Sequence, residues 1–351
     1  MTNAQVTQTV PLWNDLTIIN CAPTATAAGS ELADGKATWA PDTVRSLRLA
    51  HVGGLPAQPH APRVIVSRMA KGGVGKTTII ANLGSALAMM GHKVLMVDGD
   101  PQASLTSMMG VDPMDEGIMH VGHLMHQCYM RQPVRIKDSI KPIYANGHLD
   151  LIPADITLVN VDSWLNGAVS RELLFARLLR ENEAFFCRYE AILVDTAPAT
   201  SVLTNALMLA GRELLAVVML NGSSVKALRV LESNIAEINA AIPNLDMGIH
   251  IVANGWHGGY ADCRQALDSL VKTHGDRLNE NALPLSTSFR RQDSLLDGIP
   301  SGPVLEREPG SDSAASVAAL ARSLADRYRI LLDGRFTGVS PDVALKGTAN
   351  G

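Results

Sequence analysis

Several features that would assign this sequence of 351 residues to other protein classes are scarce or missing. The longest apolar runs, such as residues 213–220, have only the length of a strand, so no transmembrane helix is expected. The N-terminus has no basic region followed by an apolar stretch, which argues against a signal peptide. The formal net charge of -4 argues against a protein that coats nucleic acid with its whole surface, but it allows a local basic patch.

Cysteine is also scarce. The four cysteines lie far apart in the chain, at Cys21, Cys128, Cys187 and Cys263. Because none of them has the close spacing of a redox or metal motif, we expect reduced thiols in a cytoplasmic protein. Apolar residues make up 46% of the chain, and its length allows one large α/β domain or two ordinary ones with a substantial core.

The chain changes character near residue 62. Residues 1–62 are rich in Ala, Thr, Pro and Gly, and they predict a largely flexible N-terminal extension with a short helix near 41–50. From Arg63 on, short apolar runs alternate with helical segments. We therefore expect one α/β domain at 63–334, followed by a flexible tail at 335–351.

The pattern within this domain predicts strands that alternate with helices. Strands are expected at 63–69, 93–98, 149–154, 190–195, 213–220 and 247–254, and helices at 76–91, 156–180, 201–210, 223–241, 259–274 and 311–334. Strands that are separated by helices need crossover connections, so the fold class is α/β with a mainly parallel, doubly wound sheet and helices on both faces. Ligands of such sheets bind beyond the carboxyl ends of the strands.

A glycine-rich turn, "KGGVGKTT" at 71–78, joins the first strand to the first helix. Its backbone N–H groups and the helix N-terminus can surround phosphates. Lys76 would neutralise the β- and γ-phosphate oxygens, and the Thr77 hydroxyl would ligate Mg²⁺. The expected nucleotide contacts from this turn are Gly72, Gly73, Val74, Gly75, Lys76, Thr77 and Thr78. Ala70 stands where the usual phosphate-loop motif has its first glycine.

Carboxylates follow two later apolar runs. Asp195 ends one of these runs and is suited to hold a Mg²⁺-bound water. Asp98 and Asp100 lie at the end of "VLMVDGD". A solvated turn is the ordinary interpretation of such a segment, but at a strand end beside a phosphate loop the pair would face the nucleotide.

These segments together resemble the ParA/MinD family of ATPases with a deviant Walker A motif, and most closely its ParA/Soj-type DNA partition members. The resemblance rests on "KGGVGKTT", on "DGDPQ" at 98–102 and on "VDTAP" at 194–198, where the family's usual double proline is a single one. It covers residues 63 to about 210. It implies a P-loop NTPase fold, bound ATP and Mg²⁺, and a homodimer that forms with ATP.

The resemblance also implies roles for single residues. Lys71 matches the signature lysine, which reaches across the dimer to the phosphates of the other protomer; a solvated surface lysine is the alternative. Asp100 would orient the attacking water, so that Lys71, Lys76 and Asp100 form the catalytic set, and Asp98 would lie near the Mg²⁺ shell with Thr77 and Asp195. Asn254 resembles the position that reads adenine, and a turn-forming asparagine is an equal alternative.

Hydrolysis should be slow without a partner. No arginine finger is evident in the loop, and such a group supplied in trans accelerates phosphoryl transfer by roughly 10³- to 10⁵-fold. We therefore expect a Mg-dependent ATPase that a partner protein stimulates.

Several features favour the DNA partition branch. The tail has no amphipathic basic run of the kind that membrane-positioning members carry. No cysteine follows Pro198 closely, as a shared iron–sulfur cluster would require, and no tyrosine follows Tyr328, as a regulatory tyrosine kinase would. Partition members bind DNA non-specifically through arginines in the C-terminal half, and Arg290 and Arg291 match such a position. Lys226, Arg229 and Arg264 are weaker candidates.

The resemblance thus implies a cytoplasmic ATPase, nucleoid-associated when ATP is bound, without a membrane partner. It would segregate plasmid or chromosomal DNA together with a ParB-like centromere-binding protein. A nucleotide-gated transcriptional regulator that acts through the N-terminal extension is one alternative, and a cargo-positioning ATPase of the same family is another. The extension shows no clear helix-turn-helix, so we do not expect autorepression.

One cluster lies outside these motifs. His120, His123, His126 and Cys128 are close enough in sequence to make a metal site on a helix conceivable. A Met- and His-rich helix that packs near the "DGDPQ" segment is the simpler interpretation.

Overall fold

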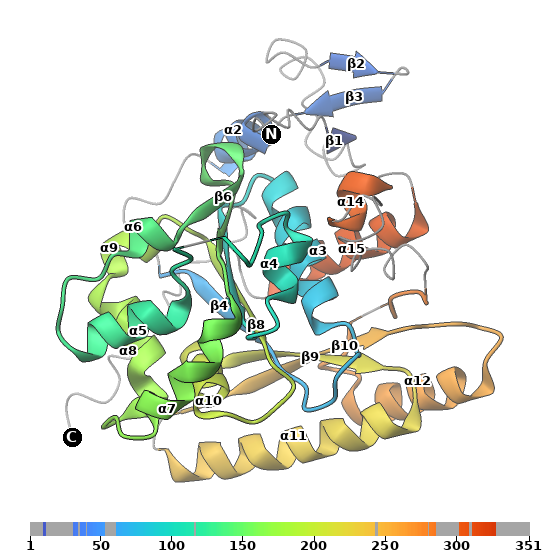
Figure 1. The fold of residues 1–351 in the computed structure, drawn as a ribbon. Coiled ribbons are helices and arrows are strands. Elements are labelled where there is room, and N and C mark those ends of the chain that lie inside the picture. Colours follow the sequence, from blue (N-terminus) through green and yellow to red (C-terminus); the bar gives the residue numbers. More distant parts are fainter. Residues whose placement is uncertain are drawn as a thin grey trace, which may run out of the picture.

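A computed structural model describes residues 10–11, 31–33, 36–39, 41–52, 61–115, 117–242, 245–279, 281–285, 302–308 and 311–327. Its centre is a seven-stranded sheet with the strand order β10-β9-β4-β8-β5-β7-β6 (Figure 1). The strands are β4 (Arg63–Ser67), β5 (Val94–Gly99), β6 (Lys141–Tyr144), β7 (Leu149–Ile152), β8 (Ala191–Thr196), β9 (Glu213–Met219) and β10 (Gly248–Asn254). All neighbouring strands are parallel except β6 and β7, so the predicted mainly parallel sheet is confirmed.

Helices cover both faces of this sheet, as predicted (Figure 1). On one face α3 packs on β4, β5 and β8, and α14 and α15 lie against α3; on the other face α10 packs on the same strands and α8. Helix α11 packs on β9 and on α12. The bounds of these helices are α3 (Lys76–Met89), α5 (Val121–Tyr129), α8 (Leu174–Glu181), α10 (Val202–Gly211), α11 (Gly222–Ala241), α12 (Ala261–His274), α14 (Val304–Arg307) and α15 (Asp312–Arg327).

The central strands β5 and β8 explain why the site lies where it does. Every residue of both strands is buried, because helices cover the two faces of a parallel sheet and its strands then read as continuous apolar runs. The exceptions to this apolar character come at the carboxyl ends, where Asp98 and Asp195 pair in register. The sheet therefore brings two buried carboxylates to one edge.

The continuous helix predicted at 156–180 is wrong. The chain there forms 3-10 turns at Ile156–Asn160 and Arg171–Leu173 and the helices α7 (Val161–Leu165) and α8. Ser170, between α7 and the second turn, has a φ of 53°, which a helix cannot contain. The short helices α4 (Ser104–Met108), α6 (Ile136–Ser139) and α9 (Glu183–Phe186) complete the domain, with a 3-10 turn at Ala145–Gly147.

Strand β6 is an addition that the sequence pattern does not reveal. It is antiparallel and lies at the edge of the sheet, and it includes Pro142. Proline has no N–H to donate to a ladder, and edge strands tolerate this. A four-residue, partly exposed edge strand has too little apolar alternation to be recognised in the sequence.

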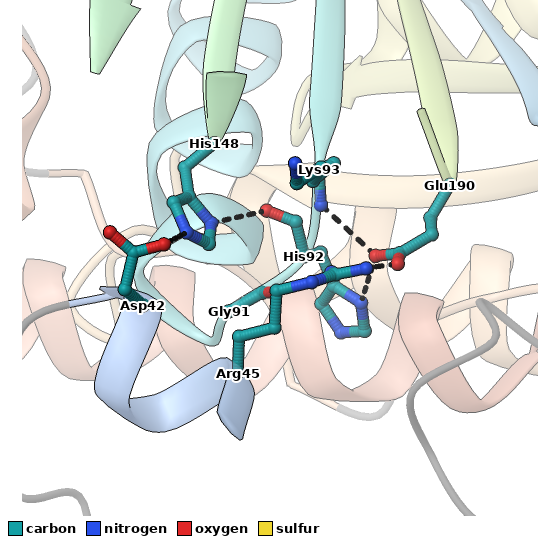
Figure 2. A network of polar contacts seen from close by, with 7 residues as sticks. All are labelled: Asp42, Arg45, Gly91, His92, Lys93, His148 and Glu190. Atoms are coloured by element: carbon teal, nitrogen blue, oxygen red, sulfur yellow. Dashed lines mark hydrogen bonds and ion pairs between the residues drawn. The ribbon is translucent and has the colours of Figure 1, made fainter. Parts of the chain in front are cut away.

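Before the domain, β1 (Val10–Pro11), β2 (Glu31–Ala33) and β3 (Lys36–Trp39) form a small antiparallel sheet, and α2 (Pro41–Val52) follows, where the sequence predicts a short helix. Helix α2 lies beside the residues that precede β5, β7 and β8, namely Lys93, His148 and Glu190 (Figure 2). Arg45 Nη1 lies 2.7 Å from Glu190 Oε1 and donates to the Gly91 carbonyl at 2.9 Å. Asp42 Oδ1 lies 2.8 Å from His148 Nε2. We call these contacts the α2 clamp.

Replacing Arg45 with alanine is expected to lower the free energy of unfolding by about 2 to 4 kcal/mol, because it leaves the buried Glu190 carboxylate without its arginine partner and with only His92 and the Lys93 amide. Urea denaturation of both proteins measures the difference. The matched control is Arg135→Ala, since Arg135 and its partner Asp138 are 65% and 48% exposed. Arg135→Ala should lower the free energy of unfolding by less than about 1 kcal/mol. Equal effects of the two substitutions would show that the clamp contributes no more than a surface ion pair.

The effect of Arg45→Ala should also depend on pH. Burial raises the pKa of Glu190, but the hydrogen bond and charge of His92, the charge of Arg45 and the Lys93 amide together hold that pKa below its usual value of 4.5. A carboxylate with a lowered pKa stabilises the fold above its unfolded pKa, and this contribution is lost as the pH falls through the folded pKa. The difference between parent and variant should therefore be complete at neutral pH and shrink as the pH falls below 4.5. A difference that stays constant down to acid unfolding would contradict the assignment to Glu190.

Candidate functional site

The phosphate loop leaves β4 and enters α3 through two glycines in left-handed conformations. Gly73 has a φ of 70° and Gly75 a φ of 96°. A Cβ atom at position 75 would lie 2.6 Å from Asn254 Nδ2, so both the backbone and the space require glycine there. Asn254 Nδ2 donates to the Val74 carbonyl at 2.9 Å. Asn254, from the end of β10, thus fastens the loop from the side.

Lys76 is the first residue of α3, and it is buried. Burial lowers the pKa of its ammonium group; the charges of Asp195 and Asp100 act against this shift, and the charge of Arg68 adds to it. The ammonium group is thus held at the positive end of a helix, close to two carboxylates. Such a desolvated cation is suited to neutralise a phosphate.

Asp195 and Thr77 meet at the carboxyl end of β8. Thr77 Oγ1 donates to Asp195 Oδ2 at 2.6 Å, and Ser67 Oγ donates to the other carboxylate oxygen at 2.8 Å. Burial raises the pKa of Asp195, and the hydrogen bonds from Thr77 and Ser67 and the charge of Lys76 oppose the shift. A hydroxyl and one carboxylate are oxygen ligands of the kind that Mg²⁺ accepts beside phosphates and waters. These two groups fit such an ion.

Asp98 plays a different part in this structure. Its Oδ2 accepts from the amide and the hydroxyl of Thr106 at 2.9 and 2.7 Å, and its Oδ1 accepts from the Asp100 amide. Burial and the charge of Asp195 raise the pKa of Asp98 to about 7. The carboxylate thus holds the segment 98–106 in place. A metal contact of Asp98 stays a prediction, and a direct one through Oδ2 would require Thr106 to release that oxygen.

Asp100 lies one residue beyond β5 and is only half-buried. Its Oδ1 accepts from the Gln102 amide at 2.9 Å. Its charge acts to raise the pKa values of both Lys76 and Asp195. Partial exposure leaves its side chain accessible to water, and the role of Asp100 in orienting the attacking water stays a prediction.

Lys71 is partly exposed, and its ammonium group contacts the start of α11. Its Nζ donates to Ser223 Oγ at 2.6 Å, Ser224 Oγ at 3.1 Å and Asn221 Oδ1 at 3.2 Å. Asn221 is the N-cap of α11, where its side chain also accepts from the Ser224 amide. The signature lysine is thus held in its own protomer at the start of α11.

The remaining predicted positions are exposed on helices or lie outside the described residues. Arg290 and Arg291 belong to the residues that the structure does not describe. Lys226 and Arg229 are exposed on α11, and Arg264 is exposed on α12. No helix in the described part of the chain is long and apolar enough to cross a membrane.

The histidine cluster is explained by packing. The rings of His120 and His123 stack with centroids 3.8 Å apart, and His120 Nε2 lies 3.1 Å from Thr157 Oγ1. Burial lowers the pKa of His120 to about 4, with the charge of His123 acting in the same direction. No group of three or more His, Cys, Asp or Glu among the described residues could hold a metal. The His- and Met-rich segment is helix α5.

Four residues that the sequence reasoning overlooks support the site. Ser67 and Arg68 stand at the end of β4, Thr106 holds Asp98, and Asn221 holds Lys71. The sequence carries a signal for two of them. Ser67 is a polar residue at the carboxyl end of an apolar run, and Asn221 follows another such run directly before a helix, as an N-cap does.

Comparisons with known proteins agree with this geometry. A family model described as an AAA domain matches residues 62–248, more than half of the chain. The sporulation initiation inhibitor protein Soj of Bacillus subtilis is 39% identical over 148 residues, which are 41% of this chain and 54% of Soj. A probable plasmid-partitioning protein ParA of Thermus thermophilus is 33% identical over 177 residues, half of each chain.

A solved structure of a Cyanothece McdA variant in complex with ATP has the same fold, with a TM-score of 0.62 at 21% identity. It covers 77% of this chain, and this chain covers 98% of it. The matched domain contains the phosphate loop, both aspartate-bearing strands and the lysine pair at the positions described above. The chain belongs to the ParA/MinD family of P-loop ATPases.

Proposed function

We propose that this protein is a Mg²⁺-dependent ATPase of the partition type, which dimerises with ATP, binds DNA non-specifically and segregates DNA with a ParB-like partner in the cytoplasm. The observation that carries the catalytic part is the convergence of Thr77, Asp195 and Lys76 at one glycine-lined loop, with Thr77 Oγ1 2.6 Å from Asp195 Oδ2. The names of the Thermus relative and of the McdA complex, which refer to plasmid partitioning and to ATP, support the biological part.

We assign each residue of the site a role according to its position. The amides of 72–78 and the α3 N-terminus surround the phosphates, and Lys76 neutralises the β- and γ-oxygens. Thr77 and Asp195 would hold Mg²⁺, which neutralises charge on the phosphates. The carboxylate of Asp100 accepts a hydrogen bond from the attacking water and orients it toward the γ-phosphorus. Asn254 fixes the loop through the Val74 carbonyl, and we propose that it also borders the adenine.

The DNA contact is proposed for the ATP-bound dimer only. A chain of net charge -4 binds phosphates weakly as a monomer, and two protomers double the number of cations that face one duplex. Arg290 and Arg291 remain the first candidates. Lys226 and Arg229 support them, because they lie three residues apart on α11 and are both exposed.

Replacing Asp100 with alanine is expected to lower kcat for ATP hydrolysis by on the order of 10²-fold, because the attacking water loses its acceptor. ATP binding should change little, since the side-chain hydrogen bond that the structure gives for Asp100 is with the Gln102 amide and not with the phosphate loop. The ATP-bound dimer should therefore persist and bind DNA, with an affinity that falls steeply as salt rises.

Phosphate release, light scattering with ATP and DNA binding at several salt concentrations measure these three properties. Asp115→Ala is the matched control, because Asp115 is exposed and lies beyond the site. Unchanged turnover in Asp100→Ala would remove this residue from the mechanism. A parent dimer that hydrolyses ATP but does not bind DNA would favour a cargo-positioning ATPase that acts without DNA.

A further inference from the structure

Arg68 is a buried arginine immediately after β4, and it contacts a loop far away in sequence. Its Nη1 donates to the carbonyls of Pro198 at 3.0 Å and Ala197 at 3.3 Å. Its Nη2 donates to Thr200 Oγ1 at 3.0 Å. The side chain is 4% exposed, which is rare for arginine. One guanidinium thus joins the strand before the phosphate loop to residues 197–201, which we call the switch II loop.

The partners of this guanidinium are neutral. In the described part of the chain no carboxylate lies within ion-pair distance of Arg68, and burial lowers the pKa of its guanidinium. A buried cation is costly unless its donors are satisfied. Here three oxygens of one loop accept hydrogen bonds from the guanidinium, so the arrangement depends on this loop staying in place. The planar fork of arginine suits such a set of acceptors, and the single ammonium of lysine does not.

The switch II loop is partly exposed, and hydrogen bonds from Arg68 contribute to its position. The loop joins β8, which carries Asp195, to α10, and Ala199 and Thr200 are exposed. A cavity of about 360 Å³ between α10 and α11 is lined in part by Arg68, Thr200 and Ile238. The loop therefore has space beside it, and Arg68 reaches across to hold it.

Arg68 also lies close in sequence to the phosphate loop. Arg68 precedes Lys71 by three residues, on the limb of the chain that rises into the phosphate loop. Its charge contributes to the lowered pKa of Lys76, so its field reaches the phosphate-binding group. The guanidinium thus links the segment that leads into the phosphate loop to the switch II loop.

We infer that Arg68 is a positioning residue that fixes the switch II loop relative to the phosphate loop, so that the hydrolysis step depends on it and nucleotide binding does not. The inference rests on the proposed ATPase function. In this proposal Arg68 acts through the carbonyls of Ala197 and Pro198, two and three residues beyond Asp195, and not through a contact with the nucleotide. Displacing this loop would misplace the groups around the metal and the attacking water.

The test compares Arg68→Met, which keeps the apolar stem, with Arg68→Lys, which keeps the charge, and with Thr200→Val, which removes only the hydroxyl contact. For Arg68→Met we expect kcat to fall by roughly 10- to 100-fold, the scale of a misplaced catalytic group. The Kd for a fluorescent ADP should stay within about threefold. The kcat values of Arg68→Lys and Thr200→Val should lie between those of Arg68→Met and the parent. Arg180→Met, a substitution of an exposed arginine on α8, is the control.

Amide hydrogen exchange gives a second readout that needs no turnover. Exchange in residues 197–201 should be faster in Arg68→Met while exchange in β5 and β8 is unchanged. A parent chain that does not hydrolyse ATP would overturn the proposed function, and the exchange experiment would still decide on the loop contact. A parent-like kcat in Arg68→Met overturns the inference. A loss of both kcat and nucleotide affinity also overturns it, because it would mean that the arginine contacts the phosphates. If Arg68→Met does not fold, parent-like kcat in both Arg68→Lys and Thr200→Val overturns it.

Discussion

Replacing Lys76 with alanine is expected to lower the affinity for ATP by about 10³-fold, the scale of losing a buried charged partner, and to remove measurable hydrolysis. The reason is its place at the N-terminus of α3, where it is buried beside the Thr77–Asp195 pair. The remaining amides of the loop can still donate to phosphates, but they carry no full charge. Titration with a fluorescent ATP analogue measures the loss.

The folded structure should survive this substitution. Burial already disfavours the charged form of Lys76, so alanine removes a desolvation cost together with the charge. Thermal unfolding without nucleotide should therefore differ little between parent and Lys76→Ala, whereas ATP should stabilise only the parent. Lys137→Ala, at an exposed position on α6, is the matched control for affinity. Nucleotide binding by Lys76→Ala within tenfold of the parent would contradict the proposed phosphate site.

The sequence is sufficient to predict the phosphate loop and the aspartates because their positions follow from strand ends. A parallel sheet gathers the carboxyl ends of its strands at one edge, so a polar residue after an apolar run marks that edge. Asp98 and Asp195 satisfy this rule, and the register of β5 and β8 places them side by side. Lys76 and Thr77 follow from the motif itself.

The contacts of these residues could not be predicted, since they depend on segments far apart in the chain. Thr77 donates to Asp195, 118 positions away, and Arg68 reaches residues about 130 positions away. The helix predicted at 156–180 is wrong for a related reason. Its apolar spacing resembles one long helix, but Ser170 with its left-handed backbone turns the chain where α8 meets α10. Both the long-range contacts and the break in the predicted helix depend on tertiary packing.

Replacing Lys71 with alanine is expected to weaken ATP-driven dimerisation by on the order of 10³-fold, and with it hydrolysis and DNA binding, while ATP binding by the monomer stays within about threefold of the parent. In the single chain Lys71 donates to three neutral oxygens of Asn221, Ser223 and Ser224. Phosphate oxygens of a second protomer would offer the ammonium stronger, charge-assisted hydrogen bonds. The lysine can therefore leave α11 when two ATP-bound protomers meet, and its transfer favours the dimer.

A matched variant separates this role from a structural one. Ser223→Ala removes the shortest contact of Lys71 in the single chain, at 2.6 Å, and leaves the ammonium in place. If Lys71 acts across the dimer, Ser223→Ala should dimerise with ATP as well as the parent or better, because the competing state loses a hydrogen bond. If Lys71 only braces the start of α11, both substitutions should weaken the protein alike. Sedimentation with ATP distinguishes these results, and a Lys71→Ala protein that dimerises and binds DNA like the parent would show that the lysine acts within its own protomer.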